Sequence, residues 1–290
     1  MTTLFLDIFS GISGDMFVGA MLDLGVEISE LRTELNKIEL KGYRLRSRRE
    51  SRSGIEGVKF DVLEAEPTVD QRSLEASVDS REAMLETHRH GSEQHDGYHA
   101  HVTADAEDDD PRVHDHSESR DFARIRELIE TSQLSDWVKK RAVAVFHCIA
   151  VAEGKIHGKP PEQVHFHEVG AIDSIVDIVG ACIALEMLGK PRVLASPTVD
   201  GTGWVRCAHG RFPVPTPATL EMLGTRQIPL TQCDEPHELI TPTGAALLVE
   251  FVEHFGAMQN LAPDRIGYGL GTRENVTRPN VLRAILSDSR

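Results

Sequence analysis

Apolar and polar positions follow regular patterns along most of the chain, and the type of pattern changes from segment to segment. Short apolar or alternating runs bounded by Gly, Pro or Ser predict strands, whereas apolar residues at helical spacing predict helices. Strands are predicted at residues 3–9, 43–49, 55–63, 192–199, 265–271 and 280–286. Helices are predicted at residues 15–24, 28–38, 121–130, 134–153, 171–188, 216–223 and 241–255.

The stretch from residue 67 to residue 120 interrupts these patterns. It is poor in branched apolar side chains and rich in His, Asp, Glu and Ser, which is typical of a segment that cannot build a core. We therefore predict a disordered insertion at 67–120 in a main domain made of residues 1–66 and 121–290. Because strands and helices interleave irregularly in that domain, the expected fold class is α/β or mixed α+β, with a mixed sheet packed with helices.

Charge is unevenly distributed along the 290 residues, whose formal net charge is −15. Residues 88–121 hold ten Asp or Glu against three Arg, a net of −7, so the other 256 residues carry −8. An acidic surface disfavours nucleic-acid binding, which depends on neutralising phosphates, and it also disfavours anionic membranes. The hydrophobic fraction of 40% and the charged fraction of 27% are ordinary for a globular protein.

The sequence pattern predicts a cytoplasmic protein without a targeting or membrane-spanning segment. The first residues lack a basic start, and Asp7 and Asp15 interrupt the apolar run. The most apolar stretch, 172–188, contains three acidic residues. The four cysteines are widely scattered and form no CxxC pair, which favours reduced thiols over a disulfide framework.

The densest chemistry lies in the Val-His-Phe-His-Glu segment at 164–168 and in the helix predicted after it. His165 and His167, two residues apart, would point to one side of an extended segment, and Asp173 and Asp177 share one helix face. The apolar flanks indicate burial, where imidazoles and carboxylates need partners, and a divalent metal suits this mixture of ligands. The alternative is structural: Asp173 caps the helix and the histidines bond to the backbone.

The insertion contains half of the fourteen histidines of the chain. Their spacing suits flexible chelation rather than a fixed tetrahedral site, and an Asp triplet at 108–110 adds hard oxygen ligands. Such binding would depend on pH because imidazole must be neutral to coordinate a metal. A solvated spacer is the alternative. The seven histidines are His88, His90, His95, His99, His101, His114 and His116.

The segment 7–16 predicts a strand–turn–helix junction. The free N–H groups at the start of a helix attract phosphate or carboxylate, but Asp15 would repel a bare anion. The junction therefore suits an anion bridged by a cation, with Asp7 and Asp15 as ligands. It is not a Walker loop, because no GK[ST] sequence follows. Helix capping by Ser13 or Asp15 explains the same residues without a ligand.

Three further patterns carry weaker signals. The Pro-fixed loop 206–215 combines Cys207, His209 and two arginines, and it could hold a phosphate or a sulfur-bearing ligand or be an ordinary surface loop. The glycines of 267–271 precede no helix, so a dinucleotide-binding fold is disfavoured. Three arginines alternate along 44–48 and are interpreted as a solvated strand face.

Taken together, five ordered motifs resemble one protein family, the LarC nickel-insertion proteins of nickel-pincer cofactor biosynthesis. The similarity extends over nearly the whole chain and includes a His-rich insertion at the same place. Members of the family are usually longer, with a C-terminal domain associated with CTP binding and oligomerisation, whereas this chain stops at Arg290. The motifs that carry the resemblance are residues 7–16, 165–180, 207–217, 238–245 and 267–273.

The resemblance implies a CTP-dependent nickel chelatase, a lyase, that inserts Ni²⁺ into pyridinium-3,5-bisthiocarboxylic acid mononucleotide. CTP would act with Mg²⁺ or Mn²⁺, and the full-length form would be a homo-oligomer. The implied partners are the mononucleotide and a separate chain that supplies the C-terminal domain, with no nucleic acid and no membrane.

The candidate site residues fall into three groups. The catalytic candidates are Asp7, Asp15, His165, His167, Glu168 and Asp173. The cofactor-binding candidates are Ser13, Gly14, His209, Arg211 and Thr243. The metal-ligand candidates are His165, His167, Glu168, His88, His90, His95, His99 and His101.

Two other functions remain open from the residues alone. A metal-dependent hydrolase would use the His-x-His-Glu segment to activate water and would not need the His-rich insertion. A non-catalytic nickel store or chaperone would need the insertion and not the His-x-His-Glu segment. Deletion of residues 88–116 would separate the two, because a hydrolase would keep its activity and a store would lose its metal.

Overall fold

The computed structural model describes residues 2–64, 120–166, 169–207 and 210–288. These residues belong to one compact unit, formed by residues 1–65 and 117–290. The insertion predicted at 67–120 lies outside the described residues, so its boundaries stay a prediction. In the described part of the chain, no helix combines the length and the apolarity needed to cross a bilayer.

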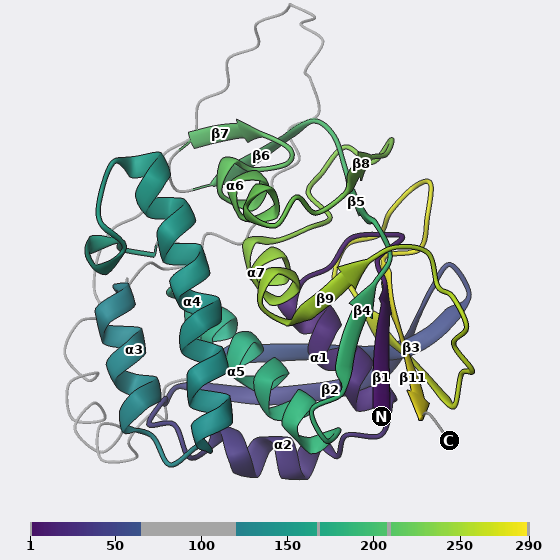
Figure 1. Ribbon diagram of the computed structural model, residues 1–290, viewed down its shortest axis with the longest axis horizontal. Helices are drawn as coiled ribbons and strands as arrows, with labels where there is room; N and C mark the ends of the chain where they lie inside the picture. The colour runs from purple at the N-terminus through teal and green to yellow at the C-terminus, as the bar shows by residue number, and fades with distance from the viewer. Residues whose placement is uncertain (1, 65–119, 167–168, 208–209, 289–290) are drawn as a thin grey trace, which may run out of the picture. The chain divides into compact units, whose positions relative to one another are not determined.

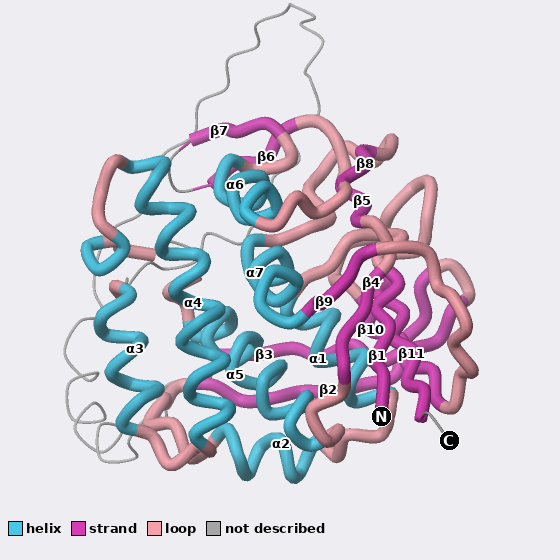
Figure 2. The backbone as a smooth tube through the Cα atoms, viewed as in Figure 1, coloured by secondary structure: helices cyan, strands magenta, loops and turns pink. Residues whose placement is uncertain are grey.

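The described elements alternate along the chain as a mixed α+β fold, which confirms the predicted fold class (Figure 2). The strands are β1 (Thr2–Asp7), β2 (Tyr43–Arg52), β3 (Ile55–Glu64), β4 (Arg192–Ala195), β5 (Thr198–Asp200), β6 (Trp204–Cys207), β7 (Gly210–Pro213), β8 (Leu230–Gln232), β9 (Val252–Phe255), β10 (Arg265–Leu270) and β11 (Val281–Asp288). The helices are α1 (Gly14–Asp23), α2 (Ile28–Leu35), α3 (Phe122–Thr131), α4 (Asp136–His157), α5 (Ile172–Met187), α6 (Pro217–Thr225) and α7 (Pro242–Phe251), with a 3₁₀ turn, η2, at Pro161–Gln163.

Seven strands form one mixed sheet in the order β2-β3-β10-β11-β1-β4-β9. β1 pairs with β11 in antiparallel register and with β4 in parallel register, and β4 continues in parallel to the edge strand β9. Two small two-stranded sheets, β5-β8 and β6-β7, lie outside the main sheet. The carboxyl ends of three neighbouring parallel strands, β1, β4 and β9, therefore meet at one edge, where ligands commonly bind in α/β proteins.

Helices α1, α5 and α7 pack beside the sheet, and α4 and α3 lie beyond them (Figure 1). Alternate residues of β1, namely Leu4 and Leu6, are fully buried against these helices. Helix α1 lies directly on β10 because Gly267 and Gly269 have no side chain there. A Cβ added at Gly269 would be 1.8 Å from the backbone oxygen of Met16.

Local sequence signals explain where several helices begin. The side chain of Asp121 accepts a hydrogen bond from the Arg124 N–H at the start of α3, at 2.7 Å. The Thr241 hydroxyl accepts from the Gly244 N–H at the start of α7, at 3.2 Å, and Pro242 occupies the first helical position.

Three details differ from the sequence-based predictions. The strand predicted at 192–199 is divided into β4 and β5 around Pro197, which cannot donate a ladder hydrogen bond. The helix predicted to reach residue 255 ends at Phe251, and Val252–Phe255 form the edge strand β9 instead. The loop predicted at 206–215 contains most of the hairpin β6–β7.

Candidate functional site

The loop between β1 and α1, residues 8–13, is the centre on which the candidate site is built. It leaves the carboxyl end of a central strand and is joined by backbone hydrogen bonds to the loop before α7. The Ile12 N–H donates to the Leu239 carbonyl at 2.9 Å, and the Thr241 N–H donates to the Ile12 carbonyl at 3.1 Å. These bonds place the starts of α1 and α7 side by side.

A chain of charges extends from the start of α1 to the β2–β3 hairpin. The Lys59 ammonium, with a side chain only 3% exposed, contacts the carboxylate of Asp15 and lies 3.3 Å from that of Asp61. Asp61 also pairs with Arg46 at 3.2 Å and with Arg48. Burial by itself would raise the pKa of Asp61, but Lys59 and Arg48 hold it below its ordinary value.

Asp177 of α5 completes this junction from the other side. Its carboxyl group lies against Gly14, where an added Cβ would be 2.6 Å from the Asp177 Cβ, so the close approach at this point requires glycine. The Asp177 Oδ1 is buried and has no hydrogen-bond partner. Burial, and then the negative charges of Asp15 and Asp173, raise the pKa of Asp177 well above its ordinary value.

Asp7 is not part of this junction. Its carboxylate pairs with Arg283 of the neighbouring strand β11, with Nε–Oδ2 at 3.0 Å. In β1, Asp7 alternates with the buried Leu6 and so points to the opposite face of the sheet. Asp7 and Asp15 thus pair with different cationic side chains, Arg283 and Lys59, and their role as joint ligands of a cation stays a prediction.

Two buried carboxylates fix the loops on the other side of residues 8–13. Asp200 is fully buried, and its Oδ1 accepts hydrogen bonds from the backbone N–H groups of Gly201, Leu239 and Ile240 at 2.8, 2.7 and 3.2 Å. Its Oδ2 is buried without a partner, and burial raises the pKa of Asp200 although the three N–H donors oppose the shift. This carboxylate orders the segment that precedes α7.

Glu235 plays the same role for the loop between β10 and β11. It accepts hydrogen bonds from the Val276 N–H at 3.1 Å and from the N–H and hydroxyl of Thr277 at 2.5 and 2.6 Å. Burial by itself would raise its pKa, but the Thr277 donors dominate and the pKa of Glu235 lies below its ordinary value. Glu235 is thus an ionised clamp that holds residues 275–278 beside the β1–α1 loop.

A row of polar side chains runs along that contact. The His237 Nε2 lies 2.9 Å from the Asn275 Oδ1, and the Asn275 Nδ2 donates to the Ser10 hydroxyl at 3.2 Å. Next to it, the Arg278 Nη1 donates to the Phe9 carbonyl at 2.7 Å. Imidazole, amide, hydroxyl and guanidinium groups therefore line the carboxyl end of β1.

The His-Glu segment lies immediately before α5 in the sequence. Val164 and Phe166 are buried, whereas His165 between them is exposed, so the apolar flanks occupy the core and the imidazole does not. The burial expected for His165 was therefore wrong, since alternate positions of an extended segment face opposite sides. His167 and Glu168 lie outside the described residues, and their role as ligands stays a prediction, as does that of the insertion histidines.

The cofactor-binding candidates are spread over three elements. Ser13 and Gly14 lie at the start of α1, and the Thr243 hydroxyl is 2.8 Å from that of Thr241 at the start of α7. Arg211 belongs instead to the β6–β7 hairpin, where its guanidinium stacks 5.4 Å from the centre of the Trp204 ring. His209 lies outside the described residues. Among the described residues, no three His, Cys, Asp or Glu side chains are grouped as a metal site.

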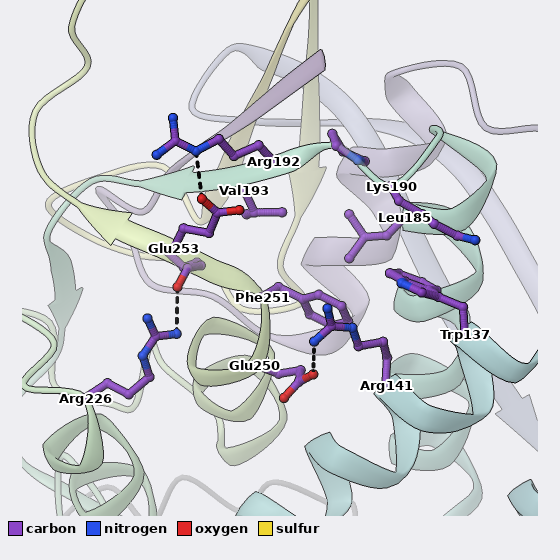
Figure 3. Close-up of a pocket in the computed structure, with 12 residues that line it drawn as sticks. Trp137, Arg141, Leu185, Lys190, Arg192, Val193, Arg226, Glu250, Phe251 and Glu253 are labelled. Atoms are coloured by element: carbon purple, nitrogen blue, oxygen red, sulfur yellow. Dashed lines mark hydrogen bonds and ion pairs between the residues drawn. The ribbon is translucent and has the colours of Figure 1, made fainter. Parts of the chain in front are cut away.

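A separate cavity lies beside β4 and the edge strand β9 (Figure 3). Its two carboxylates pair with two of its four basic side chains: Arg141 pairs with Glu250 at 2.5 Å and Arg192 pairs with Glu253 at 2.8 Å. Arg226 donates to the carbonyls of Val249 and Val252, both at 2.7 Å. These contacts join α4, α6 and α7 to the sheet edge, and we interpret the cavity as structural.

Comparison with known proteins assigns the family. The sequence model described as nickel insertion protein matches residues 4–290. The chain belongs to the nickel insertion protein family. The match includes all the elements that build the junction at β1, α1 and α5.

Curated relatives cover the chain almost completely. It is 42% identical over 288 residues to the pyridinium-3,5-bisthiocarboxylic acid mononucleotide nickel insertion protein of Geobacillus kaustophilus, and 44% identical over 292 residues to the protein of the same name from Lactiplantibacillus plantarum. A putative nickel insertion protein of Wolinella succinogenes is 45% identical over 289 residues. These matches cover 99, 100 and 99% of this chain but only 60, 62 and 61% of the relatives. No solved structure matches the chain.

The sequence patterns did not identify several residues of the site in this nickel insertion protein family member. Lys59 and Asp61 appeared only as part of an alternating strand, and Asp200 and Glu235 belong to no recognisable motif. Their partners are distant in sequence or are backbone N–H groups, which leave no pattern of side chains. The one available signal was the Ser-Gly-Asp sequence at 13–15, which correctly places the start of α1.

Proposed function

We propose that this chain carries out nickel insertion into pyridinium-3,5-bisthiocarboxylic acid mononucleotide, as a nickel chelatase of the lyase class. The observation that carries the proposal is the family match along residues 4–290, together with the names of relatives that cover the whole chain. The substrate after which the relatives are named has three chemical features: a cationic ring, two thiocarboxylates and a nucleotide phosphate. The product is the nickel-pincer nucleotide.

The chemistry of insertion is an exchange of ligands around Ni²⁺, which is a substrate of the reaction. Nickel accepts imidazole nitrogen and carboxylate oxygen, and it also binds sulfur, so the thiocarboxylates of the mononucleotide can take the ion from nitrogen and oxygen donors. In this proposal His165, His167 and Glu168 hold the ion before transfer. The exposed position of His165 supports a donor that solvent-borne nickel can reach.

The junction at α1 and α5 would then receive the organic substrate. Asp15 and Asp173 remain candidates for the insertion step, and Asp177 joins them because its buried carboxyl group lies between the two helix starts. Ser13, Gly14 and Thr243 lie on the loops that converge there and are proposed to contact the substrate, together with His209 and Arg211 from the β6–β7 segment. Asp7 has a more structural environment, since Arg283 neutralises it.

CTP dependence, with Mg²⁺ or Mn²⁺, is a further part of the proposal. The described residues do not fit such a site, because no three of their metal-ligating side chains are grouped and no Walker loop follows β1. No step of the insertion is therefore assigned to CTP within these residues. The chain spans about 60% of the length of its curated relatives, and we propose that a C-terminal-domain chain and homo-oligomer formation accompany CTP use.

We also propose that the His-rich segment collects nickel through His88, His90, His95, His99 and His101, and that the protein is cytoplasmic. A hydrolase and a non-catalytic nickel store are the alternatives. The test compares the wild type with a variant lacking residues 88–116 in three assays: nickel bound per chain, ester hydrolysis and metallated mononucleotide formed.

If the chain is a nickel insertion protein, the deletion variant should bind fewer nickel ions per chain and still form metallated mononucleotide when free Ni²⁺ is abundant. If it is a nickel store, neither the wild type nor the deletion variant should form this product. Metal-activated ester hydrolysis that survives the deletion, without metallated mononucleotide, would support the hydrolase.

A further inference from the structure

Arg278, in the loop between β10 and β11, is a cation that has no carboxylate partner in the part of the chain that the structure describes. Its side chain is half-buried, and its Nη1 donates to the Phe9 carbonyl at 2.7 Å. Its Nε is buried and has no hydrogen-bond partner. Among the described residues, no carboxylate lies within ion-pair distance of the guanidinium.

Most of the other half-buried or buried arginines of the described chain pair with a carboxylate, as Arg52, Arg141 and Arg283 do. Arg126 is half-buried without an ion pair among the described residues, but its guanidinium lies over the Phe122 ring, 5.7 Å from the ring centre. Taking a charged group out of water without an opposite charge is costly, and this protein, with a net charge of −15, has many carboxylates to offer. A guanidinium that lacks a carboxylate partner among the described residues therefore indicates a position that can take an anion from outside them.

The surroundings of Arg278 hold it rigidly in place. The Glu235 clamp fixes residues 276 and 277 immediately before it, and the Asn280 Nδ2 donates to the Arg273 carbonyl at 2.9 Å. The loop is thus tied at both ends. Fixed donors lose little freedom when they bind a ligand, and preorganisation of this kind is typical of binding sites.

The location is equally informative. The Phe9 carbonyl that orients the guanidinium lies just after β1, at the edge where three parallel strands end. The row formed by Ser10, Asn275 and His237 lies beside it and supplies further hydrogen-bonding groups. A guanidinium next to such donors and acceptors is well suited to an anionic group attached to a polar organic molecule.

We propose that Arg278 is the residue that anchors an anionic group of the organic substrate, a phosphate or a thiocarboxylate, at the carboxyl end of β1. This inference rests on the proposed function, because the mononucleotide is the substrate in question. Both groups share the chemistry that a guanidinium recognises, and the experiment below distinguishes them.

The test measures binding rather than turnover, in the absence of nickel. Dissociation constants are determined by calorimetry for the mononucleotide and for the nucleoside obtained by removing its phosphate. The proteins are the wild type, Arg278→Gln, Arg278→Lys and the matched control Arg226→Gln. Arg226 is a suitable control because it also donates only to backbone carbonyls but lies at the separate cavity beside β9. Thermal unfolding of each variant verifies that it is folded.

Arg278→Gln should weaken mononucleotide binding about tenfold or more, Arg278→Lys should lose less, and Arg226→Gln should change binding by less than about twofold. If only mononucleotide binding weakens, the anchored group is the phosphate; if nucleoside binding weakens equally, it is a thiocarboxylate. Folded Arg278→Gln that binds both ligands as the wild type does would overturn the inference and leave the proposed function intact. A wild type that binds neither ligand would overturn both, and Arg278-dependent binding without nickel transfer would contradict the proposed function alone.

Discussion

The substitution Asp177→Asn is expected to stabilise the protein at pH 7. Burial and the nearby carboxylates of Asp15 and Asp173 raise the pKa of Asp177 above its unfolded value. A carboxyl group of this kind contributes stability that is fully present below the unfolded pKa, near 4, and is lost as pH rises through the folded pKa. At pH 7 the folded state must therefore either keep the Asp177 carboxylate charged in a buried position or bind a proton there. Both cost free energy that the unfolded chain does not pay.

Asparagine removes this cost and preserves the shape of the side chain. Its amide oxygen can still accept the Asp15 N–H, a hydrogen bond that Asp177 makes now. The desolvation penalty of a buried group is about 1–3 kcal/mol and is larger for a charged group, and at pH 7 only the aspartate can carry the charge that burial and the nearby carboxylates disfavour. We therefore expect the free energy of unfolding to rise by about 1–3 kcal/mol at pH 7 and to change by less than about 0.5 kcal/mol near pH 4.

Urea unfolding of the wild type and Asp177→Asn between pH 4 and pH 8 measures this difference. Asp264→Asn is the control, because Asp264 is exposed and is not among the charges that raise the pKa of Asp177, so the change should alter stability by at most about 0.5 kcal/mol. If the site assignment is also correct, the stabilised variant should transfer less nickel, since functional carboxylates are commonly kept at a cost in stability. A loss of stability at pH 7, or a difference that does not vary with pH, would refute the reasoning.

Three further outcomes are expected. Lys59→Met should lower the free energy of unfolding, measured in urea, by about 3–5 kcal/mol, because it leaves Asp15 without its cation. The control Lys140→Met, on the exposed side of α4, should change it by at most about 0.5 kcal/mol. Equal effects of the two substitutions would show that the Lys59 pair is unimportant. His165→Ala should abolish nickel transfer with less than about 0.5 kcal/mol change in stability, because the side chain is exposed, and normal transfer would remove it from the site. Deletion of residues 88–116 should lower the number of nickel ions bound per chain, measured by calorimetry at pH 7.5. The difference between the wild type and the deletion variant should be smaller at pH 5.5, where imidazole is protonated. An unchanged number would contradict the proposal that this segment collects nickel.

The sequence predicted elements whose signals are local. Helix α5 follows from a long apolar run that ends at Gly189, and α7 begins where Thr241 and Pro242 supply a cap and a first turn. β9 was mistaken for the end of α7 because Val252 to Phe255 continue an apolar run that fits either structure. Parallel pairing with β4, about sixty residues earlier in the chain, decides the outcome, and periodicity carries no information about such pairing.

The sequence predicted only those parts of the candidate site that have local signals. The glycine and aspartate at 14 and 15 mark the start of α1, and the spacing of Asp173 and Asp177 placed them on one helix face, as α5 shows. The cation that neutralises Asp15 comes from β3, and its identity depends on how the hairpin folds back against α1. The clamps at Asp200 and Glu235 bind backbone N–H groups, which every residue except proline offers, so no sequence pattern identifies them.

Formation of the metallated mononucleotide is the measurement that tests the central claim most directly. The purified chain is incubated with Ni²⁺ and pyridinium-3,5-bisthiocarboxylic acid mononucleotide, with and without CTP and Mg²⁺, and the product is detected by mass spectrometry against a protein-free control. The account predicts nickel-containing mononucleotide above the control, formed by the wild type and not by His165→Ala. Wild-type chain that binds both Ni²⁺ and the mononucleotide but yields no more product than the control, with or without CTP, would contradict it.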